Sequence, residues 1–328
     1  MGKSSDRGKR PAGKRLGNVA AKSVAAFLRG LIWLLGQQPL KVHYFWASIL
    51  SWFLRKIVHY RESVVYTNLA WAFPYMSYKE IRTVARDFYD HLAEIMVETI
   101  WFGGSSLERI HRQHIAAVSN PELISDLSQG GRPVLVLTAH TGNWELLGGT
   151  SAYVYNFDLP AVELDRLFIV YKELESKVSD FVFYENRRQP IPGFQGMIES
   201  KGFLRFLLSR RNEPNLYFII NDQYPSQAGI DVGNFLNQRT TAIGASAVMA
   251  NRLGMSVLFL RMDRLERGRY DLRFELITED ASAMDPKDIT LSYMSLLEKE
   301  IQEYPANWLW SHMRWKNKNV RNKDLNKR

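Results

Sequence analysis

Short apolar runs that alternate with helical segments from residue 132 onward constrain the fold of this chain most strongly. A parallel strand that is buried on both faces is continuously apolar, and strands separated by helices are typical of α/β folds. The predicted strands are RPVLVLTAH, RLFIVYK, NLYFIIND, MSVLFLRMDRLERG and YDLRFELI, and the predicted helices are NWELLGGTSAYVYN, FLRFLLSRR, TAIGASAVMANRLG and DITLSYMSLLEKEIQEYP. We therefore expect an α/β fold with a mixed, mainly parallel sheet flanked by helices, and a hairpin at one edge of the sheet around Gly268.

Residues 61–117 are predicted to be helical before this α/β pattern begins. Ser77 followed three residues later by Glu80 is a capping-box pattern at a helix start. Apolar residues then recur at helical spacing, at Ile81, Val84, Ala85, Phe88, Leu92, Ile95 and Met96. A further short helix is predicted over residues 120–128, where two glycines end it.

The segment from Val24 to Leu54 is rich in Leu, Phe, Trp and Ala, but Arg29 and the break at residues 36–39 interrupt it. Its longest apolar stretch covers only about half of the roughly 20 residues that a membrane-spanning helix needs. We therefore predict a membrane-associated helical segment over residues 23–60, formed by a pair of amphipathic or interfacial helices. A helical hairpin of an ordinary protein core is the alternative.

Positive charge is concentrated at the two ends of the chain. The net charge is +9, of which residues 1–22 carry +6 and residues 314–328 carry +6, so that the remaining residues sum to −3. A broad basic groove for nucleic acid is therefore not expected. We predict a disordered basic leader over residues 1–22 and a basic tail over residues 317–328, which face acidic lipid headgroups or are simply solvated.

Several classes of function lack support in the sequence. The absence of cysteine excludes disulfides, thiol nucleophiles and iron–sulfur clusters. There is no Walker A loop, no Gly-x-Gly-x-x-Gly fingerprint, no Gly-x-Ser-x-Gly elbow and no His-Glu-x-x-His motif. We therefore expect neither a cofactor nor a metal.

A histidine follows the first predicted strand, where functional residues of α/β sheets cluster. Residues 141–143 suit a turn and a helix start, and Glu145 then stands in the first helical turn, from which it can fold back to His140. A carboxylate on one ring nitrogen leaves the other nitrogen free as a base. The element therefore predicts a catalytic dyad that deprotonates a hydroxyl or an amine. A chance pairing of two structural residues is the alternative.

The stretch HTGNWE also resembles the His-x4-Asp/Glu motif of glycerolipid-type acyltransferases. From about residue 30 to 316, the chain resembles the lysophospholipid acyltransferase-like family that includes the bacterial lipid A late acyltransferases. The resemblance rests on five blocks in order, namely RESVVYTNLAWAFP, HTGNWE, NDQYP, FLNQRTTAIGASAVMANRLGMSVLFL and YPANWLWSHMRWK. Each block alone is unspecific, whereas five in order are specific.

The resemblance implies a glycerol-3-phosphate acyltransferase-like α/β domain over residues 61–316, with His140 as catalytic base and Glu145 as its orienting carboxylate. It implies transfer of a fatty acyl chain from an acyl carrier protein or coenzyme A thioester to a hydroxyl of a membrane lipid. In the lipid A branch this hydroxyl belongs to an acyl chain already present on the glucosamine disaccharide. The implied location is the cytoplasmic face of the bacterial inner membrane, without nucleic acid as a partner.

Further residues are implied to bind substrate: Asn143, Lys172, Arg188, Asp222, Gln223, Arg239 and Thr240. Lys172 stands where related enzymes have an arginine for the oxyanion or a phosphate. A lysine keeps the charge but lacks the bidentate fork, so the turn 186–188 is expected to supply the guanidinium; a solvated basic turn is the alternative.

Asp222 and Gln223 resemble the family's Asp-Gln pair near the acceptor, and a structural capping role for Asp222 is the alternative. Arg239 to Thr241 are expected to begin the small-residue helix, whose N-terminus could hold a phosphate. Trp310, His312 and Arg314 are interpreted as structural or headgroup contacts, and His312 is not expected to be catalytic.

Three other functions stay open. The first is the same transfer to another acceptor, such as a glycolipid, an ornithine or glycine lipid, or a lysophospholipid. The second is a non-catalytic membrane scaffold, and the third is a soluble hydrolase in which His140 activates water. For the transferase, the basic tail is expected to recruit the acidic carrier protein.

Overall fold

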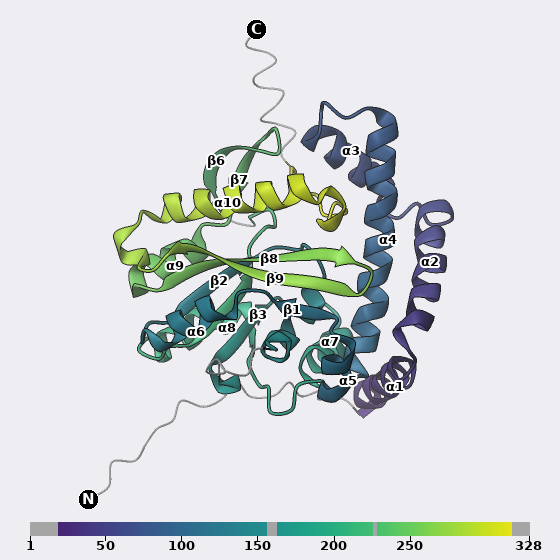
Figure 1. Ribbon diagram of the computed structural model, residues 1–328, viewed down its shortest axis with the longest axis horizontal. Coiled ribbons are helices and arrows are strands. Elements are labelled where there is room, and N and C mark those ends of the chain that lie inside the picture. Colours follow the sequence, from purple (N-terminus) through teal and green to yellow (C-terminus); the bar gives the residue numbers. More distant parts are fainter. Residues whose placement is uncertain (1–18, 156–162, 226–227, 317–328) are drawn as a thin grey trace, which may run out of the picture.

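The computed structural model describes residues 19–155, 163–225 and 228–316, and within them seven strands form one sheet in the order β1-β9-β8-β2-β5-β3-β4 (Figure 1). The strands are β1 (Ala116–Val118), β2 (Val134–Thr138), β3 (Leu167–Tyr171), β4 (Met197–Glu199), β5 (Leu216–Ile220), β8 (Ser256–Glu266) and β9 (Arg269–Thr278). Neighbouring strands are parallel except for the antiparallel β8–β9 hairpin. The predicted mixed, mainly parallel sheet is therefore confirmed.

The sheet lies between helices on both faces. The α-helices are α1 (Val19–Gly36), α2 (Leu40–Lys56), α3 (Glu62–Ala72), α4 (Tyr78–Gly103), α5 (Leu107–Gln113), α6 (Pro121–Gln129), α7 (Lys177–Arg188), α8 (Ser200–Ser209), α9 (Ala245–Leu253) and α10 (Pro286–Glu303). Leu135 and Leu137 of β2 pack in one core with α8, α9 and α10, whereas Val134 and Val136 pack in a second core with α5, α6 and the end of α4. Because successive side chains of β2 serve opposite cores, the whole strand is apolar.

Three differences from the predicted strands have local causes. Strand β1 pairs with β9 on its outer side, so the predicted hairpin lies one strand in from the edge. Strands β1 and β4 were not predicted, since each has three residues and no distinct apolar run. A separate hairpin, β6 (Ile230–Phe235) and β7 (Gln238–Ala242), was also missed.

Helix α4 runs beside α2 and past the ends of the central strands (Figure 1). The predicted capping box at its start is confirmed, because the Ser77 side chain accepts from the Glu80 backbone and the Glu80 side chain accepts from the Ser77 backbone. The predicted apolar side of α4 is confirmed for most positions; Met96 is exposed instead. Helix α4 thus connects the N-terminal helices to the α/β body.

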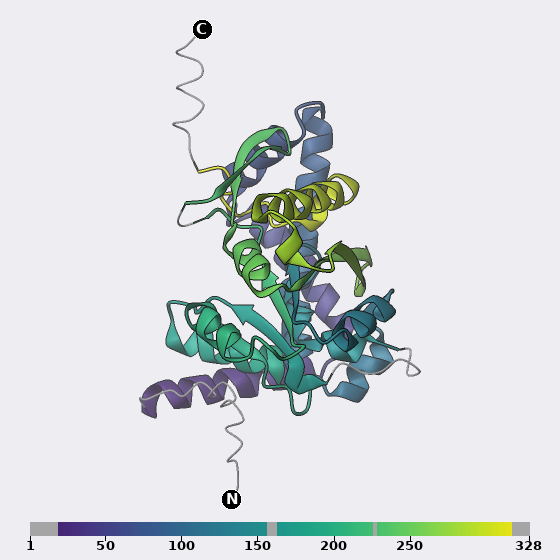
Figure 2. The same cartoon turned by 90° about the vertical axis from the view of Figure 1, so that its left-hand side faces the viewer.

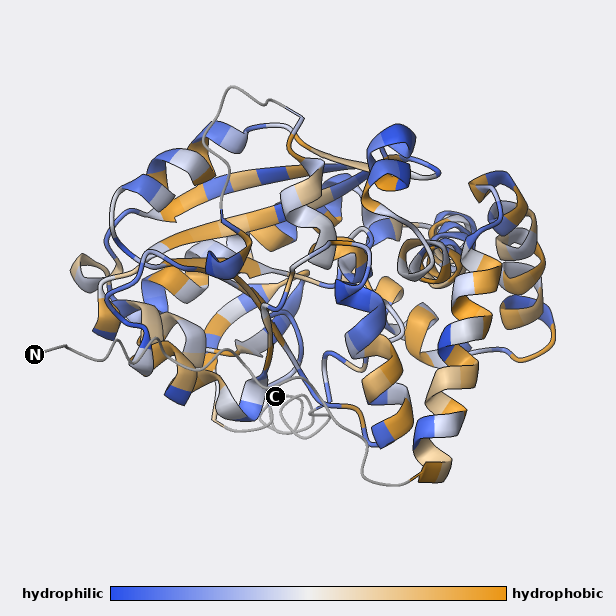
Figure 3. Ribbon diagram, turned by 90° about the horizontal axis from the view of Figure 1, so that it is seen from below, coloured by the Kyte–Doolittle hydropathy of each residue, from blue (hydrophilic) through white to orange (hydrophobic). Residues whose placement is uncertain are grey.

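The predicted pair of N-terminal helices is present as α1 and α2, separated at residues 37–39. Helix α1 lies across the base of the molecule in Figure 2 and is largely hydrophobic, at the lower right of Figure 3. Arg29 ties it to α7 by donating to Gln189 and pairing with Glu185. By length and composition α1 is apolar enough to cross a membrane, with a mean hydropathy of 1.5. Only 11% of it is buried, whereas a core helix of a soluble protein is mostly buried.

The apolar N-terminal region therefore indicates membrane association, while interfacial attachment stays a prediction. The basic leader was predicted over residues 1–22, and its last four residues are instead the first turn of α1. Residues 1–18 and the predicted tail 317–328 lie outside the described residues.

Candidate active site

The site is built where two neighbouring parallel strands end. Strands β2 and β5 pair directly, and their last residues, Thr138 and Ile220, are partners in the register. The chain continues from β2 to His140 and from β5 to Asp222, so these two side chains meet at the same edge of the sheet although they are far apart in sequence. This is the place where α/β sheets carry their functional groups.

The carboxylate of Asp222 orients the imidazole of His140. Its Oδ1 lies 2.7 Å from His140 Nδ1, and its Oδ2 accepts from the His140 backbone amide at 3.1 Å and from Trp308 Nε1 at 2.8 Å. A carboxylate only accepts, so Nδ1 carries the ring proton and Nε2 keeps its lone pair. Nε2 lies 3.5 Å from the amide nitrogen of Gln223, and 16% of the His140 side chain is exposed.

The electrostatics of this pair favour a basic imidazole. Burial alone would lower the pKa of His140, but the charge and hydrogen bond of Asp222 outweigh it, so the pKa of His140 is raised. Burial alone would raise the pKa of Asp222, but the charge and hydrogen bond of His140 hold it down at about 2. The pair therefore combines an ionised carboxylate with an imidazole that binds a proton more tightly than usual.

Glu145 does not contact the imidazole, and the predicted His140–Glu145 hydrogen bond is wrong. Its carboxylate binds the Arg187 guanidinium in a bidentate pair, Nε to Oε2 and Nη2 to Oε1, both at 2.7 Å. Glu145 is the second residue of the 3-10 helix η1 (Trp144–Tyr153), which lies within the predicted helix NWELLGGTSAYVYN and packs against α7. From there the carboxylate faces Arg187, and only its charge acts on His140, where it contributes to the raised pKa.

Two glycines permit close backbone contacts around η1: Gly148 lets η1 pack against α7, and Gly142 lets the turn before η1 pack against Met262 of β8. A Cβ on Gly148 would lie 1.9 Å from the backbone oxygen of Arg187, so a side chain there would push η1 away from α7. Gly142 has a φ of +54°, and a Cβ there would lie 2.4 Å from the backbone oxygen of Met262. The turn after His140 is therefore closed by a residue that needs to be glycine.

Asn143 was predicted to bind substrate but is fully buried. Its side-chain oxygen caps η1 by accepting from the Glu145 backbone amide, and its Nδ2 donates to Glu98 of α4 at 2.8 Å. Tyr44 and Tyr270 also donate to Glu98. Asn143 thus anchors the start of η1 to α4 and has no surface for a substrate.

The arginine that pairs with Glu145 is Arg187, whereas Arg188 is held elsewhere. Arg188 donates to the Phe194 backbone and pairs with Glu185, which keeps it within the turn after α7. Arg187 shares the heptad spacing of the buried residues Asp180 and Tyr184, a periodicity of α7 that could have identified it. Lys172 follows β3 as expected and is exposed, and its role at the site stays a prediction.

The predicted helix start at Arg239 and Thr240 is wrong, because both residues lie on β7, and their binding of substrate stays a prediction. The hairpin turns at Leu236 and Asn237, both with positive φ, and α9 starts only after Gly244. Arg239 is exposed and pairs with Asp231, while Thr240 accepts from Trp315 Nε1 at 2.9 Å. Neither residue presents an α9 N-terminus to a phosphate.

The segment after α10 completes the wall of the site. Trp308 was not singled out from the sequence, although it lies in the quoted block YPANWLWSHMRWK and donates to Asp222. Trp310 donates to Pro305, and Arg314 is buried and donates to Thr241. His312 accepts from the Tyr224 backbone, and burial lowers its pKa to about 4, so it is neutral near pH 7.

Comparison with known proteins agrees with the resemblance noted in the sequence. A family model described as bacterial lipid A biosynthesis acyltransferase matches residues 19–317, a range that contains every helix and strand of the described structure. A search of curated proteins found no match.

Proposed function

Because this chain belongs to the bacterial lipid A biosynthesis acyltransferase family and is therefore an acyltransferase, we propose that His140 is the general base of its transfer reaction. The donor is an acyl carrier protein or coenzyme A thioester, and the acceptor is a hydroxyl of a lipid A precursor. The observation that carries the proposal is the Asp222–His140 hydrogen bond, which leaves Nε2 as the lone-pair nitrogen of a partly exposed side chain. Asp222 therefore takes the orienting role that the sequence assigned to Glu145.

The reaction follows from this geometry. His140 Nε2 takes the proton of the acceptor hydroxyl as its oxygen attacks the thioester carbonyl. The tetrahedral intermediate collapses, the carbon–sulfur bond breaks, and His140 returns the proton to the leaving thiolate. The products are an ester and a free thiol. The adjacent Asp222 carboxylate stabilises the imidazolium that forms in between.

Arg187 is the proposed electrostatic partner of the developing oxyanion. Its Nε and Nη2 bind Glu145, which leaves N–H groups of the guanidinium free to donate. Its positive charge also lowers the pKa of His140, a contribution that requires proximity to the ring. Glu145 thus acts as a positioning residue that holds Arg187 beside the reacting atoms, and the exposed Lys172 remains the second proposed donor.

The proposed setting is the cytoplasmic face of the bacterial inner membrane, where thioester donors are available. The apolar α1 and the exposed apolar side chains of α2 support attachment of the enzyme to the lipid that contains its acceptor. The acceptor can then reach His140 without leaving the bilayer.

The proposal is tested by incubating membranes that contain the protein with acyl carrier protein thioesters and a tetra-acylated lipid A precursor, followed by mass measurement of the lipid. We expect a gain of one acyl chain and a loss of about 10³-fold in rate for His140→Ala. Parallel incubations with lysophospholipid and aminolipid acceptors separate the acceptor from the chemistry. If no acceptor gains mass, or if His140→Ala is as active as the native chain, the proposal is wrong.

A further inference from the structure

A cavity of about 410 Å³ opens where α2, α3 and α4 meet, away from the residues of the candidate active site. Five of its lining side chains are cationic: Arg55, Lys56, Lys79, Arg82 and Arg86. Glu62 is the carboxylate among them. The cavity thus concentrates positive charge on a part of the chain that, without its two ends, has a net charge of −3. Its volume suits a small ligand or a headgroup.

Most of this charge is not neutralised by neighbouring carboxylates. Arg55 lies 3.6 Å from Asp90, and Arg86 pairs with Asp87 at 3.0 Å. Among the described residues, Lys56, Lys79 and Arg82 make no ion pair, and Glu62 is held by His59 at 2.7 Å. Three cations are therefore available for an anionic ligand.

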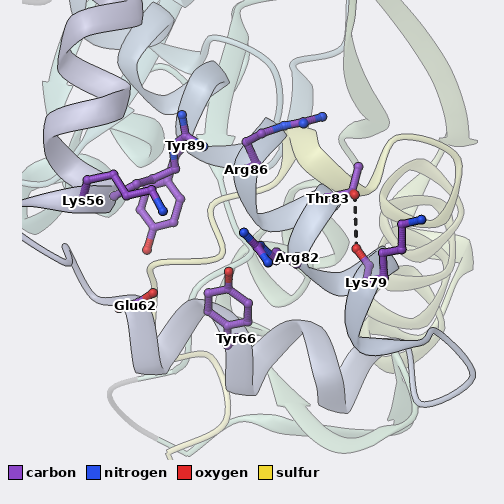
Figure 4. A pocket seen from close by; sticks show the side chains of 9 residues that line it. Lys56, Glu62, Tyr66, Lys79, Arg82, Thr83, Arg86 and Tyr89 are labelled. Carbon is purple, nitrogen blue, oxygen red and sulfur yellow. Dashed lines mark hydrogen bonds between the residues drawn. The ribbon is translucent and has the colours of Figure 1, made fainter.

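The polar ends of Lys56, Arg82 and Tyr66 turn toward a common space in Figure 4. Burial raises the pKa of the Tyr66 hydroxyl, and the charges of Arg82 and Arg55 each lower it less strongly, contributions that require the three side chains to lie close together. The lining therefore offers ammonium, guanidinium and hydroxyl donors from α2, α4 and α3. This is the donor set that recognises the oxygens of a phosphate group.

The cavity also lies at the end of an apolar face that no other part of the described structure covers. Along α2 the exposed apolar side chains recur at helical spacing and form what we call the α2 stripe: Val42, Phe45, Trp46, Ile49, Trp52 and Phe53. The opposite side of α2, with Ala47 and Ser51, packs against α4. Lys56 continues the α2 stripe by one helical step and lines the cavity.

We propose that this cavity binds the phosphate group of an anionic membrane lipid whose acyl chains lie along the α2 stripe. Cationic side chains at the end of an interfacial helix lie at headgroup depth, where lysine and arginine attract anionic lipid. The α2 stripe supplies the apolar contact that free phosphate or a soluble acidic protein would not need. The site is independent of the transfer chemistry, because none of the four charged residues at the transfer site, His140, Glu145, Arg187 and Asp222, lines the cavity.

The test uses the purified full chain and titration calorimetry with monomeric short-chain phosphatidylglycerol. The pocket variant is Lys56→Gln/Arg82→Gln, and the matched control is Lys201→Gln/Arg205→Gln, which removes the same two charge types from the exposed surface of α8. We expect saturable binding to the native chain, no binding of short-chain phosphatidylcholine, and an affinity about 25-fold weaker for the pocket variant, at about fivefold for each of its two cations. The control should bind as the native chain does.

Three results would overturn the proposal. Inorganic phosphate that binds as tightly as the lipid would make this a free-phosphate site. Equal weakening by the pocket variant and the α8 control would show diffuse charge attraction rather than a site. Normal lipid binding by the pocket variant, with weakened binding of acyl carrier protein, would assign the cavity to the carrier. Unchanged thermal unfolding of both variants serves as the folding control.

Discussion

The active-site edge and the α2–α3–α4 cavity both contain several charged side chains, but the charges are buried and paired at the first and exposed and largely unpaired at the second. At the ends of β2 and β5, Asp222 is 3% exposed and Glu145 is 12% exposed, and each is paired with a basic group at 2.7 Å. In the cavity, Lys56, Lys79 and Arg82 are exposed and make no ion pair among the described residues. A buried charge without a partner has a large desolvation cost, whereas an exposed charge is hydrated and can remain unpaired until a ligand binds.

This difference separates two kinds of mutational effect. Removal of one partner from a buried pair leaves the other charge without compensation in a poorly hydrated environment. Removal of an exposed cation has little effect on folding and weakens only the binding of its ligand. The active-site residues should therefore couple activity to stability, and the residues of the cavity and the α2 stripe should not.

The largest effect on activity among the variants below is expected from Asp222→Asn. The asparagine amide fills the same space but no longer raises the pKa of His140. Its NH₂ group replaces the oxygen that accepts hydrogen bonds from the His140 backbone amide and from Trp308 Nε1. We expect a rate loss of about 10²- to 10⁴-fold. In the native enzyme the base is lost by protonation as pH falls through the raised pKa of His140, so this acid limb should move to lower pH in Asp222→Asn.

The measurement is kcat/KM against pH for the native chain and the variant, with Asp231→Asn as a control at an exposed aspartate. An acid limb at the same pH in all three proteins would contradict the assignment of Asp222 as the orienting carboxylate.

The largest effect on stability is expected from Arg187→Gln. It leaves Glu145 buried without its bidentate partner, which should cost about 3–5 kcal/mol and lower the Tm by about 10 °C. The double variant Arg187→Gln/Glu145→Gln removes both charges and should recover most of the stability but none of the activity. Scanning fluorimetry and the transfer assay measure the two separately. Recovery of activity together with stability would reduce Arg187 to a structural residue.

The α2 stripe should show the reverse pattern. Phe45→Ser/Ile49→Ser removes two exposed apolar side chains and should weaken binding to vesicles by about tenfold for each residue. The Tm should stay unchanged. Leu204→Ser/Leu208→Ser on α8 is the matched control, since these leucines are similarly exposed on another helix. Vesicle flotation measures the partition, and equal losses in both variants would contradict a membrane-facing role for the α2 stripe.

The smallest effect is expected from Glu98→Gln beneath the site. Burial raises the pKa of Glu98 to about 7, against its hydrogen bonds from Tyr270 and Asn143. The folded state therefore holds a proton that the unfolded state has lost, so Glu98 lowers stability as pH rises from about 4.5 to about 7. The neutral glutamine should flatten the Tm–pH curve in this window and change the rate only a few-fold, as measured by scanning fluorimetry and the transfer assay. An unchanged slope would show that Glu98 is ionised throughout.

The elements of the fold were largely predictable because they depend on local patterns. The apolar run 133–137 identified β2, and Ser77 with Glu80 identified the start of α4, since each pattern acts within a few residues. The missed strands β1 and β4 are three residues long and depend on their neighbours for definition. The misplaced helix start near Thr240 has a similar cause, because the β6–β7 hairpin is held by cross-strand pairing rather than by an apolar pattern.

The site was predictable in part. His140 was found from its position after a strand, and Asp222 from the end of another, but their pairing was not. Glu145 was chosen as the partner of His140 because it stands in the predicted first helical turn after it and fits the His-x4-Glu motif. Arg187 was passed over in favour of Arg188, because residues 186–188 were interpreted as a turn and not as the end of helix α7.

The sequence by itself determined most of the longer strands and helices, the basic residue at the end of β2 and the apolar character of the first two helices. Local preference and hydrophobic periodicity act over one or two turns and need no knowledge of distant residues. Only the tertiary structure decided which charges meet. The order of strands places β5 beside β2, so that Asp222 pairs with His140, while Glu145 pairs with Arg187. The packing of α2, α3 and α4 brings cations from separate segments around one cavity. Such contacts depend on chain segments far apart in sequence, because a buried charge takes the partner that packing brings to it.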